Sequence, residues 1–256
     1  TCGLRSDGTA ACWGSGSSGK LGGGSTAGSN TGVNVLAANN QPLSEIVQLT
    51  VSDVHSCALH GRGAVSCWGQ NAYGQVGAGT VGTDAAVAQV VFESGIQAID
   101  AGGNHTCVIL TGPDGENGNG VVKCWGQNLN ETLGNKGVDD NSYSLEPVFV
   151  QINNQSYVSS ARKLSVGYQH SCVINSKNRV RCWGSKQYGQ AGSGGSGTTN
   201  QFAQFVYLNN SETQHFEEVV DIAAGDFHTC AISTKDGYPA VYCWGRNEKG
   251  QLGIGQ

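Results

Sequence analysis

The sequence predicts an all-β fold, a β-propeller of at least five repeats, and three observations predict it. Cys-Trp-Gly recurs five times at steps of 55, 57, 58 and 61 residues, and self-similarity at a long fixed period indicates a repeat architecture. The segments between these motifs are short, rich in Val, Ile and aromatic residues, and bounded by Gly, Asn, Asp and Ser, as strands are. No stretch has a convincing helical period; the nearest, residues 84–92, fits an extended strand equally well. Three or four strands in each repeat fit a propeller blade.

Each repeat contains the same elements in the same order. An apolar run ends in a turn, as in residues 96–103 and 219–225. His-Ser/Thr-Cys then opens a second strand, and its histidines are His55, His105, His170 and His228. A polar turn leads to an alternating strand that ends in Cys-Trp-Gly, and a Gly-Gln-x-Gly segment closes the unit at residues 74–77, 189–192 and 250–253. The third copy departs with Glu131-Thr132-Leu133-Gly134. We place the repeats of this single domain, 1–256, at about 1–30, 45–80, 95–137, 160–197 and 218–256.

The ten cysteines form five pairs, one in each repeat: Cys2 with Cys12, Cys57 with Cys67, Cys107 with Cys124, Cys172 with Cys182, and Cys230 with Cys243. The members of a pair lie on consecutive strands joined by a short turn, where facing residues approach closely enough for a disulfide. We therefore expect one disulfide in each blade hairpin, and with it an extracellular or cell-surface location, because such bonds persist in oxidising compartments.

Zinc is the competing interpretation of the cysteines, because His and Cys two residues apart on a strand point to one face. The sequence lacks the C-x₂₋₄-C spacing of zinc sites, so we expect no metal and no cofactor. The histidines are expected instead to make structural hydrogen bonds near the preceding glycine turn.

All five tryptophans stand directly after the second cysteine of a pair: Trp13, Trp68, Trp125, Trp183 and Trp244. A large ring on the same side of every blade is best explained by packing between blades. Exposed platforms for sugars or bases are the alternative. We expect the five rings to be mostly buried and structural.

The combined motif resembles the regulator of chromosome condensation repeat family. Residues 101–105 and 224–228 match its Ala-Gly-x-x-His stretch, and residues 244–253 match its Trp-Gly to Gly-Gln-Leu-Gly end. The resemblance covers the whole chain and implies a β-propeller, usually of seven blades. The paired cysteines resemble those of secreted members. The nuclear exchange activity of the family is not expected, because the basic chromatin-binding tail and an inserted wedge are missing.

Composition excludes several classes of function. Charged residues make up 13% and the net charge is −5, whereas nucleic-acid-binding domains are basic. No apolar stretch is long enough to span a membrane, and no catalytic motif is present. Asp139-Asp140-Asn141 lacks the spaced ligands of a calcium loop and is expected to be a solvated turn.

The function predicted is therefore not enzymatic: protein or glycan binding, adhesion or extracellular assembly. Variable spacers would carry it, at residues 25–41, 79–93, 137–160 and 192–213. One alternative is an inhibitor that caps an enzyme active site, as a secreted member of the family does with a beta-lactamase, using exposed aromatic residues on one face. The candidates are Tyr73, Tyr143, Tyr157, Tyr188 and Phe202. The other alternative is a lectin.

Two further features concern processing and assembly. Four Asn-x-Ser/Thr sequons occur, of which Asn154 and Asn209 lie in polar spacers and are better glycosylation candidates than Asn130 and Asn104. The chain begins at the Ser/Thr-Cys position of its first repeat, without the preceding strand. We therefore expect a larger parent chain or a neighbouring subunit to complete that blade.

Overall fold

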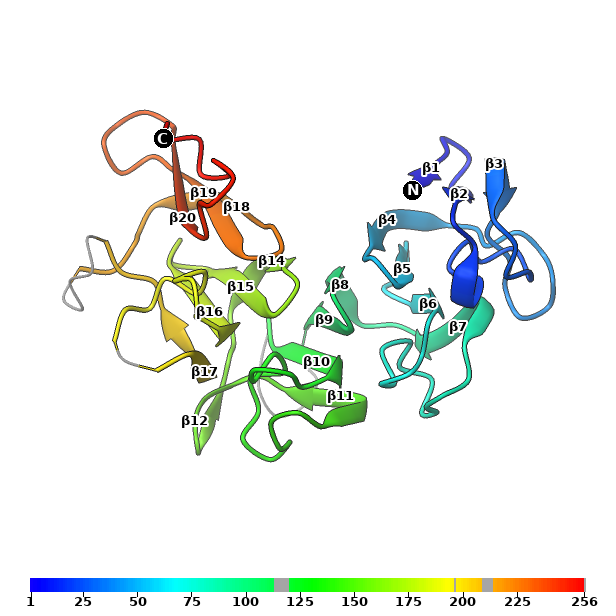
Figure 1. Ribbon diagram of the computed structural model, residues 1–256, viewed down its shortest axis with the longest axis horizontal. Coiled ribbons are helices and arrows are strands. Elements are labelled where there is room, and N and C mark those ends of the chain that lie inside the picture. The colour runs from blue at the N-terminus through cyan, green and yellow to red at the C-terminus, as the bar shows by residue number, and fades with distance from the viewer. Residues whose placement is uncertain (113–119, 196, 209–213, 256) are drawn as a thin grey trace.

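Five antiparallel sheets of three or four strands follow one another along the described chain and around an open arc (Figure 1). This computed structural model describes residues 1–112, 120–195, 197–208 and 214–255. The N-terminal and C-terminal sheets lie on either side of the opening of the arc. The fold is an all-β propeller arrangement, as the sequence predicted, and each sheet is one blade.

The second, third and fourth blades have four strands each, hydrogen-bonded in chain order. Blade 2 contains β4 (Ile46–Val51), β5 (His55–His60), β6 (Val65–Gly69) and β7 (Ala85–Phe92). Blade 3 contains β8 (Ile96–Gly102), β9 (His105–Leu110), β10 (Val122–Gln127) and β11 (Tyr143–Phe149). Blade 4 contains β14 (Ala161–Val166), β15 (His170–Asn175), β16 (Val180–Ser185) and β17 (Thr199–Phe205). The first strand of each blade lies nearest the centre of the arc.

The two end blades have three strands each. Blade 1 contains β1 (Cys2–Leu4), β2 (Ala10–Gly14) and β3 (Ser29–Asn34), with the short 3₁₀ helix η1 (Ser17–Gly19) in the loop between β2 and β3. Blade 5 contains β18 (Val219–Ala224), β19 (His228–Ser233) and β20 (Ala240–Gly245). Within the described part of the chain, blade 1 lacks the inner strand and blade 5 lacks the outer strand that the central blades have.

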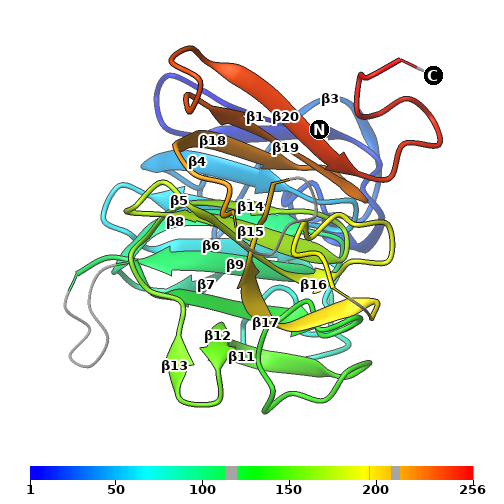
Figure 2. The same ribbon diagram turned by 90° about the vertical axis from the view of Figure 1, so that its left-hand side faces the viewer.

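The four variable spacers contain strands as well as loops. Each of the four contains the outermost strand of its blade: β3, β7, β11 or β17. The segment with the nearest approach to a helical pattern, residues 84–92, contains β7. The third spacer also holds a two-stranded hairpin of β12 (Gln151–Asn153) and β13 (Ser156–Tyr157), which projects from the body (Figure 2).

Disulfides join all five cysteine pairs within their repeats, as expected. The bonds link Cys2 to Cys12, Cys57 to Cys67, Cys107 to Cys124, Cys172 to Cys182, and Cys230 to Cys243. In every pair the two cysteines face each other across neighbouring strands, with Cα atoms 4.0 to 4.1 Å apart. No cysteine is left free for a metal ion. Among the described residues, no three His, Cys, Asp or Glu side chains form a group that could hold a metal ion.

Most of these cysteines are core residues rather than an accessible site, which the sequence did not predict. Seven are fully buried: Cys12, Cys57, Cys67, Cys107, Cys124, Cys172 and Cys182. The other three, Cys2, Cys230 and Cys243, are partly exposed and belong to the two end blades. In blade 5 the physical reason is that a disulfide in the middle of a hairpin is covered by the next blade, and no described blade follows blade 5. Cys2 lies in β1, the edge strand of blade 1, which has no inner strand beside it in the described chain.

The apolar core consists of four clusters, each between two consecutive blades. Every cluster combines a cysteine pair of one blade with the tryptophan of the next. Cys12 packs with Trp68 in the first cluster, and Cys57 and Cys67 pack with Trp125 in the second. In the last two clusters, Cys124 accompanies Trp183 and Cys182 accompanies Trp244. Because a single blade cannot bury its own faces, the repeats are stable only when stacked.

The tryptophans divide into two groups, which corrects part of our expectation. Trp68, Trp125 and Trp183 are fully buried, and Trp244 is partly buried. Trp13 is 40% exposed. The physical reason is that each ring packs against the preceding blade, and no described blade precedes Trp13.

Candidate binding surface

A repeated hydrogen-bond link fixes the distance between blades. The indole Nε1 of Trp68, Trp125, Trp183 and Trp244 donates to a backbone carbonyl one blade earlier, at 2.9 to 3.2 Å. The acceptors belong to four equivalent turns: residues 19–22, 74–77, 131–134 and 189–192. The Gly-Gln-x-Gly turn thus binds the tryptophan of the next blade. The turn at residues 131–134 keeps this role despite its different sequence.

Glycine ends each of these turns because the indole lies against it. Gly77 has a φ of +76°, and a Cβ there would lie 2.5 Å from Trp125 Nε1. Gly134 stands in the same relation to Trp183, at 2.7 Å from the ring. Both the left-handed backbone and the close contact require glycine.

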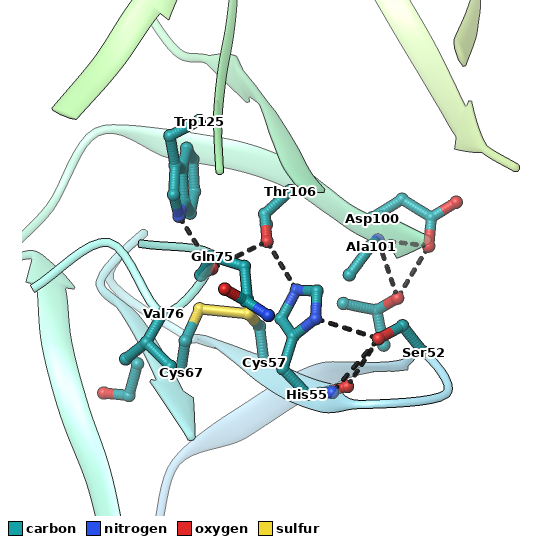
Figure 3. Close-up of a disulfide and its surroundings, with 12 residues drawn as sticks. Ser52, His55, Cys57, Cys67, Gln75, Val76, Asp100, Ala101, Thr106 and Trp125 are labelled. Atoms are coloured by element: carbon teal, nitrogen blue, oxygen red, sulfur yellow. Dashed lines mark hydrogen bonds between the residues drawn. A yellow bond between two sulfur atoms is a disulfide. The ribbon is translucent and has the colours of Figure 1, made fainter. Parts of the chain in front are cut away.

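The histidines link the blades nearer the axis. In each case the imidazole Nε2 bonds a hydroxyl group of the next blade. The distance is 2.7 Å from His55 to Thr106, 2.9 Å from His105 to Ser171, and 2.8 Å from His170 to Thr229. Each partner is the Ser/Thr of the next His-Ser/Thr-Cys motif (Figure 3). Our expectation of bonding near the preceding turn holds for Nδ1 of His55, 2.8 Å from Ser52 Oγ, and for His105, which bonds the backbone of Gly102.

Burial keeps these imidazoles neutral. Desolvation lowers the pKa of His55, His105 and His170 to about 3. The Thr106 hydroxyl donates to the carbonyl of Gln75 at 3.1 Å, so it accepts from the Nε2–H group of His55. The three histidines therefore link consecutive blades as neutral hydrogen-bonding groups.

Near these histidines, the side chain of Asp100 in blade 3 is hydrogen-bonded to blades 2 and 4 as well as to its own blade. Its carboxylate accepts hydrogen bonds from the Thr50 hydroxyl at 2.6 Å and from the backbone N–H groups of Ala101 and Val166, at 2.9 and 2.8 Å. Burial raises the pKa of this carboxyl group, and the hydrogen bonds partly oppose that shift. Sequence analysis did not identify Asp100, because the other repeats carry no acid at this position.

This scaffold presents loops on one side of the arc, which we call the upper face. It consists of the loops between first and second strands (52–54, 103–104, 167–169, 225–227) and those that follow the third strands (70–84, 128–142, 186–195, 246–255). Side-chain amide hydrogen bonds lie across it, one within blade 3 and one between blades 3 and 4. Asn104 Nδ2 donates to Gln127 Oε1 at 2.9 Å, and Asn130 Nδ2 donates to Gln169 Oε1 at 3.0 Å. Two sequon asparagines are therefore engaged in structural bonds.

An aromatic cluster lies on the upper face over blades 4 and 5, formed by Tyr168, Tyr188, Phe227 and Arg246. The ring centroid of Phe227 lies 5.7 Å from that of Tyr168 and 5.6 Å from that of Tyr188. The Arg246 guanidinium lies 4.9 Å from the Tyr188 centroid and pairs with Glu248. Tyr168 and Tyr188 are 36% and 37% exposed. The cluster combines two exposed tyrosines with a positioned cation.

Only one of the aromatic candidates from the sequence belongs to this cluster. Tyr188 does; Tyr73 lies at the equivalent turn of blade 2, and Tyr143 begins the outer strand β11. Tyr157 is in the β12–β13 hairpin and Phe202 is within β17. The five candidates are therefore spread over three blades and the β12–β13 hairpin and do not form one surface. Tyr168 and Phe227 were missed, although both occupy the two variable positions that precede a motif histidine: Tyr168 is two residues before His170, and Phe227 is directly before His228.

The other sequence candidates are also placed. Asn154 is exposed at the tip of the β12–β13 hairpin, whereas Asn209 lies outside the described residues. Asp140 accepts from the backbone N–H groups of Glu131 and Asn141, at 3.2 and 3.0 Å, and so stabilises its own turn. In the described ranges, no helix has the length and apolarity needed to cross a bilayer.

Comparison with known proteins identifies the repeat. Three segments match the regulator of chromosome condensation (RCC1) repeat: residues 46–75, 161–190 and 219–251. The ultraviolet-B receptor UVR8 of Arabidopsis thaliana is 28% identical over 246 residues, which are 95% of this chain and 50% of the receptor. The chain thus spans half the length of this relative.

Two solved structures share the fold. Human WBSCR16 superposes with a TM-score of 0.74 and 21% identity, covering 99% of this chain and 61% of that protein. Prp20p of Saccharomyces cerevisiae, described with its binding to Gsp1p and histones, gives a TM-score of 0.71 and 20% identity. It covers 100% of this chain and 58% of that protein.

Proposed function

Because the chain belongs to the regulator of chromosome condensation repeat family, we propose that it is a non-enzymatic domain that binds a protein partner through its upper face. The observation that carries the proposal is the aromatic cluster of Tyr168, Tyr188, Phe227 and Arg246. Tyrosine and arginine dominate the residues that supply most of the energy at protein interfaces. Here they stand on loops whose positions are fixed by the bonds between blades.

The chemistry of the cluster suits an interface. The ring of Phe227 contacts both tyrosine rings. Tyrosine offers a large contact area with few rotatable bonds, so little conformational entropy is lost on binding. Arg246 adds donors for an acceptor or a carboxylate of the partner. That Prp20p is described as binding other proteins supports a protein partner here.

We further propose that the domain works outside the cell or at its surface. Five disulfides, with one in every blade, support this location. Structural disulfides are rare where glutathione keeps thiols reduced. An enzyme capped by this surface would make the protein an inhibitor, so the identity of the partner distinguishes inhibition from adhesion or assembly.

Site-directed photocrosslinking tests the proposal. A benzophenone amino acid at Tyr168 is expected to capture a protein from the native extracellular material. The matched control is the same amino acid at Tyr238, which is 72% exposed in the turn between β19 and β20, on the opposite face. Phe227→Ala and Arg246→Ala should each weaken capture by about tenfold or more. Equal capture from both positions, or none from Tyr168, would contradict the proposal.

A further inference from the structure

A recess lies on the face opposite the upper face, between the β12–β13 hairpin and blade 4. Its volume is about 240 Å³. Its cationic lining residues are Lys177, Arg179 and Arg181, and no Asp or Glu is among its lining residues. In a chain with 14 Lys and Arg and a net charge of −5, three cations in one small recess are unusual.

Arg181 is the most constrained of the three. Its guanidinium lies 3.5 Å from the centroid of Phe205, and its Nη1 donates to the carbonyl of Ala203 at 2.8 Å. Stacking on the ring fixes the plane of the guanidinium, and the remaining N–H groups are donors in that plane. Burial lowers the pKa of Arg181, because its charge is partly removed from water. An anion in the recess would offset that cost.

The neighbouring cations differ in how far they are neutralised. Arg179 pairs with Glu217 at 2.6 Å, outside the lining of the recess. In the described part of the chain, neither Lys177 nor Arg181 takes part in an ion pair. Lys177 is exposed at the turn between β15 and β16. Two of the three charges are therefore available to a ligand.

The rest of the lining indicates a polyhydroxylated ring rather than a bare anion. Hydroxyl groups come from Ser159, Ser160 and Ser176, which are exposed. The Nδ2 group of Asn175 adds donors, while its Oδ1 accepts from the backbone N–H groups of Lys177 and Arg179. Tyr157 forms an aromatic wall and is 36% exposed. The volume is below that of pockets for drug-sized ligands, so it suits one ring with its acidic substituent.

We propose that this recess binds an acidic sugar unit, a saccharide ring that carries a carboxylate or a sulfate. Arg181 and Lys177 would hold the anionic group, while the serine hydroxyl groups and Tyr157 would contact the ring. The site is separate from the aromatic cluster, which lies on the opposite face, so it does not depend on the proposed protein-binding function.

Binding of defined oligosaccharides to the whole chain tests the inference. The probes are a sulfated heparin oligosaccharide, the same oligosaccharide with its sulfates removed, and a neutral maltooligosaccharide. At least one acidic probe should bind and the neutral one should not. Binding by the desulfated probe assigns recognition to the carboxylate, and binding by the sulfated probe alone assigns it to sulfate. Affinity should fall as salt rises.

Variants locate the site. Arg181→Ala and Lys177→Ala should each lower the affinity by about tenfold, because a charge-assisted hydrogen bond is lost. Arg62→Ala is the control, since Arg62 occupies the equivalent turn of blade 2 and is exposed there. Arg181→Lys covers the case in which the alanine variant does not fold: it keeps the charge but loses the planar donors. No binding of any acidic probe, or equal losses in Arg62→Ala and Lys177→Ala, would overturn the inference.

Discussion

The indole Nε1 of Trp125 donates a hydrogen bond of 3.0 Å to the carbonyl oxygen of Gln75, one blade earlier. The Thr106 hydroxyl donates to the same oxygen at 3.1 Å (Figure 3). One carbonyl thus receives two donors from the next blade. In blades 4 and 5 the pair recurs, with Trp244 and Thr229 both bonded to the Gln190 carbonyl at 2.9 Å. This relationship converts a sequence repeat into a fixed stacking geometry.

Tryptophan substitutions should therefore differ in cost according to blade. Trp125→Ala removes a fully buried ring and leaves a carbonyl with one donor fewer, so the free energy of unfolding should fall by about 3–5 kcal/mol. Trp13→Ala should cost much less, because that ring is 40% exposed. Urea unfolding of both variants measures the difference. Equal losses would show that packing between blades does not set the cost.

Acid should destabilise the protein through its buried histidines. The pKa of His55, His105 and His170 is about 3 in the folded state, against about 6.5 unfolded. The unfolded chain therefore binds more protons below pH 6.5, and stability falls with pH from there toward pH 3. At pH 5 the loss is about 2 kcal/mol for each imidazole. The raised pKa of Asp100 acts in the opposite direction.

The measurement is urea unfolding between pH 8 and pH 4.5, below which carboxylates dominate. Stability should be flat above pH 7 and should decline below 6.5. His105→Gln should reduce the steepness by about one third, since one of the three buried imidazoles is gone. A flat profile across this range, or a variant with an unchanged slope, would show that the imidazoles are not held neutral by the fold.

Sequence analysis predicted the fold and the disulfides because the repeat itself carries that information. A motif such as Cys-Trp-Gly, present in every blade, reports interactions that every blade makes. It could not predict that Trp13 is exposed while Cys12 beside it is fully buried, since burial depends on which blades lie on either side. Tyr168 and Phe227 were missed for the opposite reason: each occurs in only one repeat, and their contact joins two loops 59 residues apart. Arg181 likewise looks like an ordinary strand residue until Phe205 is paired beside it.

Removal of one disulfide should be costly but tolerable. Replacing Cys57 and Cys67 together by Ala opens a loop whose ends are 10 residues apart, and should cost about 3 kcal/mol. The bond between Cys107 and Cys124 closes a loop of 17 residues and should cost slightly more. Denaturant unfolding of the two double variants gives the comparison. Peptide mapping without reductant should recover the five pairs within repeats, and links between repeats or free thiols would refute the pairing.

Asn154 should be glycosylated when the chain is secreted from eukaryotic cells. It is exposed in the tip of the β12–β13 hairpin, where an enzyme can reach the Asn-Gln-Ser stretch. Asn104 and Asn130 should stay unmodified, because their amides are hydrogen-bonded and the sequon residues Thr106 and Thr132 are buried. Glycopeptide mapping tests this, with Asn154→Gln as control; glycan on Asn104 would contradict it.

Each end of the arc carries one half of the tryptophan–turn contact that joins consecutive blades elsewhere in the described chain. Trp13 has no described turn beneath it, and the turn at residues 250–253 holds no tryptophan within the described residues. Apolar side chains are exposed at both ends: Leu4 is 44% exposed in blade 1, and Val241 is 69% exposed in blade 5. Each end also carries a strand edge without a neighbour in the described chain, at β1 and at β20.

Free strand edges recruit other strands. Residues 1–256, expressed alone, should therefore associate head to tail. In this association Trp13 of one copy would pack on the turn at residues 250–253 of another. Light scattering over a range of concentrations should show a mass that rises with concentration, and Trp13→Ala should abolish the rise, because it removes the ring that the turn would seat. Tyr143→Ala is the control, since Tyr143 is 46% exposed but lies in blade 3, away from both ends. A wild-type chain that stays monomeric at every concentration would exclude this mode of assembly.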